Sequence, residues 1–236
     1  MDLLNQILKQ PKMSEIMLPF VVFCIFLITF PANIVALELN KNLGWYGSDL
    51  KGRPCAGKGQ GVGPFDYNNA SHRSNTNYSQ ILASHFPPKV EQLKSGNRGS
   101  LYGDLDYTLR GIPNNPRALY ALSRYQLKRK PANEETPVEC YFQRAIIFKP
   151  DDINVYILYA NYLKKMGHSD LAIKQYKSAL SYKPDHGGLH NGIGLLYLET
   201  KNYEQALQHA HEAYKNGYKR KTLKNKLKAA KKWSEA

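Results

Sequence analysis

The sequence predicts an all-α fold, a solenoid of helical hairpins that follows an irregular N-terminal segment. Apolar residues in the second half of the chain are spaced three and four positions apart, as on one face of a helix. One hairpin cannot cover its own apolar face, so repeated hairpins are expected to stack. Small residues also recur 34 positions apart, in the pairs Ala160 and Gly194, Ala172 and Ala206, and Ala179 and Ala213.

Residues 1–36 are expected to be a signal peptide or a membrane anchor. The apolar run 16–30 has the length of a signal-peptide core and is short for a span of roughly 20 residues. Ala36 offers a small residue at which a signal peptidase could cut. The alternatives are an uncleaved anchor that continues to Leu39 and a segment with neither role. A signal or an anchor would both place the rest of the chain outside the cytosol.

Residues 37–86 are expected to be irregular, because they are rich in Gly, Asn, Ser and aromatic residues and show little helical period. Four aromatic side chains are expected to hold the segment on the helical body, namely Trp45, Tyr46, Phe65 and Tyr67.

The stretch 52–58 has the G-x-x-x-x-G-K spacing of a phosphate-binding loop. However, Gly59 stands where that loop has Ser or Thr, and neither a strand before it nor a helix after it is predicted. A flexible loop is the favoured interpretation. Cys55 lies in this loop. In an oxidising compartment it could pair with Cys140, or Cys140 could be buried on a helix with Cys55 free, and both possibilities stay open.

Residues 153–186 and 187–220 are the two clearest repeat units. In the first unit one helix ends near Gly167, since glycine suits the left-handed turn after a helix, and Pro184 ends the second helix. The 34-residue period continues upstream, and residues 116–152 therefore read as a degenerate unit.

Residues 87–115 read as a degenerate helical lead-in, with one helix over 101–112 and an irregular partner over 87–96. Residues 221–236 read as a basic capping helix. Its apolar stripe of Leu223, Leu227 and Ala230 should pack on the last repeat.

This pattern resembles the tetratricopeptide repeat family, whose 34-residue unit has small residues at positions 8, 20 and 27 and Pro at position 32. Here those positions hold Ala160, Ala172, Ala179 and Pro184, then Gly194, Ala206, Ala213 and, as a departure, Tyr218. The blocks 63–67, 103–110, 113–119 and 139–146 also look like a group of exported bacterial repeat proteins. That resemblance implies a periplasmic protein, or one anchored through residues 16–39 that faces the periplasm.

The resemblance further implies a concave groove lined by the first helix of each unit. The groove would bind another protein through a peptide or an acidic segment. Asn can bond a peptide backbone and Arg can hold a carboxylate. The alternative is that the N-terminal segment fills the groove itself. The groove positions are Arg117, Tyr120, Arg124, Leu127, Asn154, Ile157, Asn161, Lys164, Asn191, Leu195 and Leu198.

The net charge of +14 points to an acidic partner, an anionic surface or a nucleic acid. Nine cations and no acid lie between Lys215 and Lys232. An acidic partner or an anionic envelope surface is favoured, or else a solvated helix face. Nucleic acid is disfavoured, because an exported chain meets no genome. An envelope assembly scaffold that acts through this face is therefore an alternative function. The predicted basic face comprises Lys219, Arg220, Lys221, Lys224 and Lys228.

No catalytic residue, cofactor site or metal site is predicted. His190 occupies a packing position of the repeat, and His186 falls in a turn. Asp104 and Asp106 are two residues apart on a helix and face different directions, so a cap or surface role is expected for them. The chain is expected to be a binding module and not an enzyme. An enzyme or ligand-binding protein that uses the Gly-rich segment is the less favoured alternative.

Overall fold

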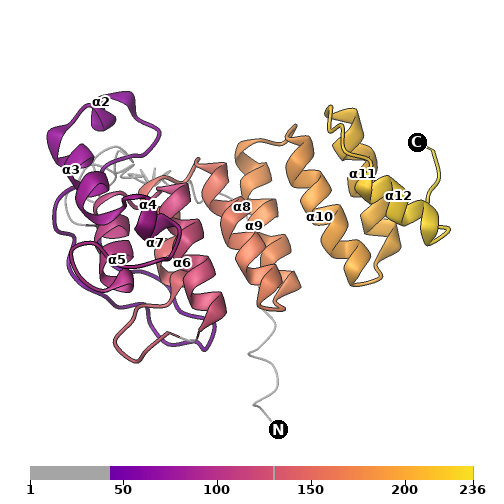
Figure 1. Cartoon of the computed structure of the whole chain (residues 1–236). Coiled ribbons are helices and arrows are strands. Elements are labelled where there is room, and N and C mark those ends of the chain that lie inside the picture. Colours follow the sequence, from indigo (N-terminus) through magenta and orange to yellow (C-terminus); the bar gives the residue numbers. More distant parts are fainter. Residues whose placement is uncertain (1–42, 130, 236) are drawn as a thin grey trace, which may run out of the picture.

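The computed structural model describes residues 43–129 and 131–235, and the predicted signal or anchor run lies outside these residues. The described ranges form a row of helices without a β-strand, which confirms the all-α solenoid (Figure 1). None of these helices combines the length and the apolar character that crossing a membrane requires. The helices are α2 Ala70–Arg73, α3 Thr76–His85, α4 Pro88–Glu91, α5 Leu101–Gly111, α6 Pro116–Lys128, α7 Val138–Phe148, α8 Ile153–Lys165, α9 Ser169–Tyr182, α10 Gly187–Glu199, α11 Tyr203–Lys215 and α12 Thr222–Ala229.

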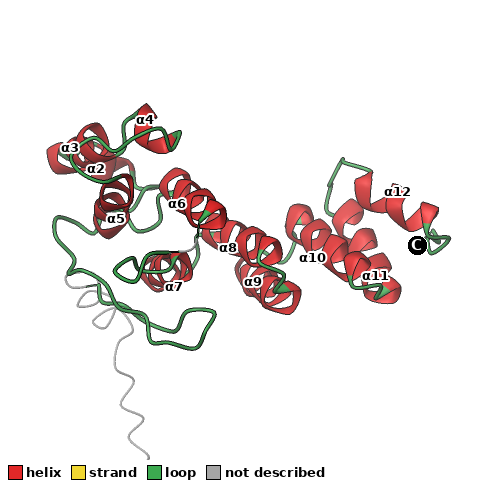
Figure 2. Cartoon of the chain, turned by 60° about the horizontal axis from the view of Figure 1, so that its bottom comes forward, coloured by secondary structure: helices red, strands yellow, loops and turns green. Residues whose placement is uncertain are grey.

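Three hairpins, α6–α7, α8–α9 and α10–α11, form the repeat region. Their first helices lie in one layer and their second helices in another (Figure 2). The residue before each first helix caps it: Asn115, Asp152 and His186 each accept a hydrogen bond from a backbone N–H of the first turn. Each first helix therefore begins directly after a residue whose side chain can cap it.

The recurring small residues lie where neighbouring helices touch. Ala160, Ala172, Ala179, Ala206 and Ala213 are fully buried. At Gly194 an added Cβ would stand 2.5 Å from Leu223 Cδ2 of α12. A larger side chain at these positions would force the helices apart, so the spacing of small residues sets the distance between the layers.

The expectation of an irregular 37–86 segment is wrong for its last part, which contains α2 and α3. The α3 helix begins after Asn75, whose side chain accepts a hydrogen bond from Asn77 N. It buries only Tyr78 and Ile81, against Ile112 after α5. So few apolar residues give a weak helical period. Packing on α5 stabilises the helix more than its own sequence does.

Arg144 of α7 holds the extended N-terminal segment against the helices. Its guanidinium is almost fully buried and donates to Leu43 O at 3.3 and 3.2 Å and to Leu109 O at 3.0 Å. It also bonds the side chain of Gln60 and lies 5.3 Å from the Trp45 ring centroid. Burial lowers the pKa of Arg144 to about 10. Carbonyl and amide oxygens, rather than a carboxylate, solvate this charge.

Three of the four aromatic residues expected to fix the segment do so. Trp45 packs edge-on against Tyr141 with ring centroids 4.9 Å apart, and Phe65 and Tyr67 pack on the Tyr78 cluster. Tyr46 does not, because its side chain is exposed.

Cys55 and Cys140 form a disulfide, with Cα atoms 5.5 Å apart. On either side of it, Thr136 Oγ1 donates to Ala56 O at 2.8 Å and Trp45 Nε1 donates to Lys58 O at 2.9 Å. The loop 52–58 is therefore fixed to the helices, and the expectation of a flexible loop is wrong. No helix begins within the described residues until Ala70, so the helix that a phosphate-binding loop requires is absent there.

Replacing Ala172 with Leu should destabilise the repeat region. The Ala172 side chain has no free volume, so the larger residue must push α8 and α9 apart, at a cost of about 1–3 kcal/mol. Thermal unfolding followed by circular dichroism measures this. The matched control is Lys174→Leu on the exposed face of the same helix, which should stay within about 0.5 kcal/mol of wild type. Equal melting temperatures for Ala172→Leu and wild type would contradict the packing described here.

Replacing Cys55 with Ala should free the 43–62 segment while the repeats stay folded. The disulfide closes a loop with a sequence separation of 85, and its loss should cost about 2–4 kcal/mol. Limited trypsin digestion should cut the variant after Lys51 or Lys58 before it cuts the repeats. A reductant should make the wild type cleave like the variant and leave the variant unchanged. Unchanged cleavage of reduced wild type would show that Arg144 and Trp45 alone hold the segment.

Candidate protein-binding groove

The groove positions of α8 are open to solvent. Asn154 and Asn161 are exposed, and Ile157 between them is half-buried. Asn161 Oδ1 accepts a hydrogen bond from Tyr176 OH at 3.1 Å, and within the described chain the Asn154 side chain makes none. This face of α8 therefore presents amide groups beside an apolar side chain.

Asn191 of α10 is 7% exposed, and one of its amide atoms has no partner. Its Nδ2 donates to Tyr218 OH at 3.2 Å, while Oδ1 is buried and unbonded. Turning the amide over would only exchange the two atoms, so one stays unpaired in either orientation. Tyr218 stands where the repeat pattern has Pro, so this departure from the pattern supplies the hydroxyl.

Arg124 Nε is the other buried side-chain polar atom without a partner among the described residues. Both unpaired atoms belong to residues that the sequence places in the groove. A buried polar group left unbonded costs about 1–3 kcal/mol. Neither atom is exposed to solvent, so neither is open to an incoming segment.

The cationic end of the predicted groove is already engaged by α4. Arg117 Nε donates to Glu91 Oε1 at 2.7 Å, and Arg124 Nη2 donates to Glu91 O at 2.6 Å. The hydrogen bond from Arg117 lowers the pKa of Glu91. Tyr120 is exposed, and its ring centroid lies 5.0 Å from the Arg124 guanidinium carbon. These arginines therefore hold the preceding helix and do not form a free carboxylate clamp.

Lys164 is engaged in a similar way. Its Nζ donates to Glu199 Oε1 at 2.6 Å, which links α8 to α10. Leu195 and Leu198 are half-buried on α10. Both leucines pack on the cluster that contains Leu223 and Leu227 of α12, so the exposed positions of the predicted groove lie mainly on α8.

The described part of the N-terminal segment does not fill the groove. Its residues 48–60 contact the second helices α5 and α7 and the loop between α6 and α7. Ser48 O accepts a hydrogen bond from Gln143 Nε2 at 2.7 Å, Leu50 N donates to Glu139 Oε1 at 3.1 Å, and Gly59 O accepts from Arg110 Nη1 at 2.7 Å. Farther along, Asn68 Nδ2 donates to Asp152 at the start of α8 at 2.8 Å, and the Phe86 ring centroid lies 5.8 Å from the Arg117 guanidinium carbon of α6.

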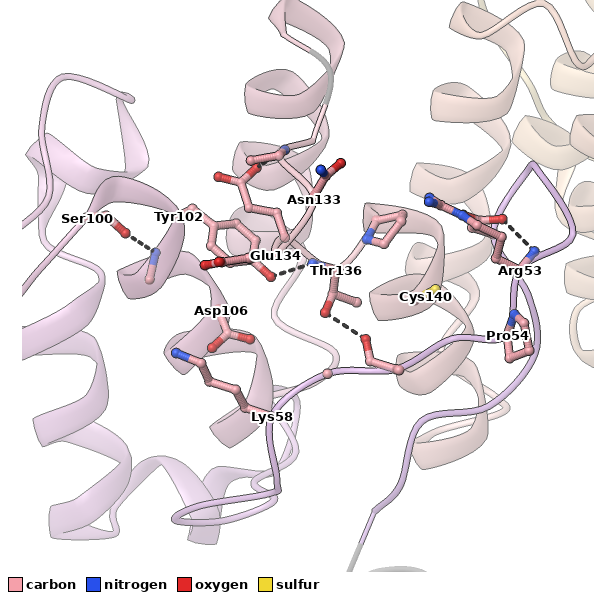
Figure 3. A pocket seen from close by; sticks show the side chains of 17 residues that line it. Arg53, Pro54, Lys58, Ser100, Tyr102, Asp106, Asn133, Glu134, Thr136 and Cys140 are labelled. Carbon is pink, nitrogen blue, oxygen red and sulfur yellow. Dashed lines mark hydrogen bonds and ion pairs between the residues drawn. The ribbon is translucent and has the colours of Figure 1, made fainter.

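A cavity of about 730 Å³, which sequence reasoning missed, lies between residues 49–58, the start of α5 and residues 132–137 (Figure 3). Its buried carboxylates are already bonded. Asp106 accepts from Tyr141 OH at 2.7 Å and from Arg110 Nε at 3.0 Å. Asp49 accepts from Arg53 Nε at 2.6 Å. No sequence pattern marked the cavity, because its walls come from segments far apart in the chain.

The cap or surface role expected for Asp104 and Asp106 is wrong, since both are buried and Ser100 is the cap of α5. Asp104 accepts from the backbone N–H of Asn97 and of Arg98, and its Oδ1 lies 2.8 Å from His85 Nδ1. The two carboxylates do face different directions, as expected. Asp104 fixes the loop before α5, and Asp106 ties α5 to α7.

Two histidines meet between α10 and α11, with the Nδ1 atoms of His190 and His209 3.1 Å apart. Burial lowers the pKa of His209 to about 4, and His190 and Lys177 add to the effect. His186 instead caps α10 through a hydrogen bond from Leu189 N. Among the described residues, no three His, Cys, Asp or Glu side chains gather as a metal site would require. His190 and His209 thus meet as a packed pair.

Comparison with known proteins gives partial matches. No known family profile matches the chain. It is 24% identical over 128 residues to the anaphase-promoting complex subunit CDC16 of Saccharomyces cerevisiae, and 31% identical over 101 residues to the BBSome complex member bbs-4 of Caenorhabditis elegans. The matches take in 51% and 40% of this chain but only 15% and 21% of those proteins.

Among solved structures, a crystal structure of MamA aligns with 64% of this chain and 95% of its own, at 20% identity and a TM-score of 0.40. Another, MamA AMB-1, aligns with 49% of this chain and 66% of its own, at 23% identity and a TM-score of 0.36. The 34-residue period and the small residues buried between paired helices are those of a solenoid of tetratricopeptide-type helical hairpins.

The His190–His209 contact predicts a loss of stability in acid. The folded-state pKa of His209, about 4, lies below its ordinary value of 6.5, so the unfolded chain takes up a proton first as the pH falls. Stability present above pH 6.5 is lost progressively toward pH 4. The fall in melting temperature between neutral and acidic pH should be smaller for His209→Gln than for wild type. The control is His168→Gln, at an exposed histidine, and its melting temperature should fall as much as that of wild type. If the melting temperature fell equally with pH in all three proteins, the proposed contribution of His209 to acid sensitivity would be excluded.

Proposed function

We propose that the chain is an interaction scaffold whose open groove over α8 and α10 binds an extended segment of another protein. The carrying observation is that Asn154 and Asn161 of α8 are exposed, with Ile157 half-buried between them in the sequence. Amide side chains can bond both the N–H and the C=O of a peptide backbone, while Ile157 and Leu195 offer apolar contact. The two relatives are, by their names, members of multi-protein complexes, which agrees with this role.

The proposed ligand differs from the acidic segment that the sequence suggested for the groove. Arg117, Arg124 and Lys164 have partners within the chain, so the open groove carries little free positive charge. A segment with exposed backbone groups and small apolar side chains suits it better. Catalysis is not part of the proposal, because the buried acids of the large cavity are bonded to neighbouring side chains.

We further propose that the chain works outside the cytosol, in the periplasm or on the membrane face toward it. Two observations support this location. The Cys55–Cys140 disulfide suits an oxidising compartment. The apolar run 16–30 has the length of a signal-peptide core, and an anchor through residues 16–39 is compatible with the same location. Determining the N-terminal residue of the native protein tests cleavage after Ala36.

A photo-crosslinking residue placed at Asn154 of the full chain tests the groove. It should form adducts with one defined segment of a partner protein when the chain is expressed in its native host. The same residue at Lys174, exposed on the second-helix layer, should not form them. Adducts formed equally from both positions, or from Lys174 alone, would refute the groove as the binding surface.

Once the segment is known, Asn154→Ala should weaken its binding about fivefold, which corresponds to about 1 kcal/mol for one lost hydrogen bond. Calorimetry with the purified full chain and the synthetic segment measures this. Lys165→Ala, an exposed change at the end of the same helix, is the control and should bind like wild type.

A further inference from the structure

A second concave surface lies at the C-terminal end of the solenoid. A cleft of about 570 Å³ is bounded by the end of α11, the turn to α12, the start of α12 and the tail that follows it. Its wall is aromatic. Trp233 packs edge-on against His211 and Tyr214, with ring centroids 5.0 and 6.1 Å away. His211 Nε2 lies 2.9 Å from Ser234 O, which fixes the tail in this position.

Cations surround this wall. Lys215, Lys219, Lys221 and Lys224 line the cleft. Of the nine cations between Lys215 and Lys232, the described chain pairs two with carboxylates: Lys224 with Glu235 at 3.3 Å, and Lys215 with Glu212 at 3.9 Å. The other seven have no carboxylate within ion-pair distance in the described ranges. Such a surface attracts negative charge and repels cationic ligands.

The tail itself places a carboxylate on this wall. Glu235 accepts a hydrogen bond from Trp233 Nε1 at 3.0 Å and pairs with Lys224 Nζ, which lies 4.4 Å from the Trp233 ring centroid. These interactions lower the pKa of Glu235, with the Trp233 hydrogen bond as the largest cause. Because Glu235 is exposed, a carboxylate from another molecule could take its place.

We propose that this cleft is a second docking site, which binds an acidic segment of a partner protein that carries one aromatic side chain. The acidic residues would lie on Lys219, Lys221 and Lys224, in the manner of Glu235. The aromatic side chain would lie against Tyr214 and Trp233, where offset or edge-on contacts between rings are favourable. This site uses α11, α12 and the tail, whereas the groove uses α8 and α10, and Tyr218 borders both because its hydroxyl bonds Asn191.

The structure favours a protein partner over a membrane surface here. A helix that binds a bilayer inserts an apolar face. The apolar face of α12 is instead packed on the last repeat, where Leu223 and Leu227 are fully buried. Ala230, expected in the same stripe, lies beyond the end of α12 and is only partly buried. The outward face of α12 therefore offers lysines without an apolar insertion surface.

Binding of a fluorescent peptide to the full chain tests the proposal. The probe is a short peptide of Glu and Asp with one central Phe, and the comparison peptide has Ala in place of Phe. The Phe peptide should bind at physiological salt at least about tenfold more tightly than the Ala peptide. Lys219→Glu with Lys221→Glu should weaken its binding by about tenfold or more. The matched control, Lys174→Glu with Lys183→Glu, makes the same change in net charge on and after α9 and should bind like wild type.

Substitutions at Trp233 distinguish recognition of the aromatic side chain from attraction by net charge alone. Trp233→Ala should weaken binding of the Phe peptide and leave the Ala peptide unaffected, and Trp233→Phe should restore most of the loss. Equal binding of the two peptides, or equal weakening by the two double variants, would overturn the proposal in favour of simple charge attraction. It would also fail if only anionic phosphatidylglycerol vesicles or a single-stranded oligonucleotide bound to the full chain, since the partner would then be of another class.

Discussion

The structure depends on close contact between neighbouring helices at small side chains. Ala160, Ala172 and Ala179 are fully buried in the second unit, and Gly194 meets Leu223 of α12 in the third. Each contact lets one hairpin cover the apolar face of the next, and the stack thereby acquires a continuous core that no single hairpin could have. The layer of first helices, and the groove positions on it, follow from this arrangement.

Interactions of a different kind attach the N-terminal segment to the helices. Arg144 lies buried among carbonyl oxygens, and the Cys55–Cys140 disulfide fixes the loop nearby. A buried cation is costly unless its donors are satisfied, so the segment and α7 depend on each other. These contacts lie on the second helix α7, whereas the predicted groove positions lie on the first helices.

The two proposed surfaces suit different ligands. The groove over α8 and α10 presents amides and apolar side chains, since its cations already have partners such as Glu91 and Glu199. The C-terminal cleft presents unpaired lysines around Trp233. A scaffold with two such surfaces could hold two different protein segments, and Tyr218 connects the surfaces because it lines the cleft and bonds Asn191.

The sequence by itself determined the repeats, because their period, small residues and helix caps are local and recur in phase. It also predicted Asn191 and Arg124 as groove positions, which stays a prediction. Only the tertiary structure decided which groove cations are free, that Cys55 meets Cys140, and that α3 is a helix. It also showed Asp104 and Asp106 to be buried. Those outcomes depend on residues far apart in the chain, such as Glu91 beside Arg117 or Ile112 beside Tyr78. A sequence pattern does not give the distance between segments that share no repeated motif. Only packing in the folded chain therefore decides which of these residues meet.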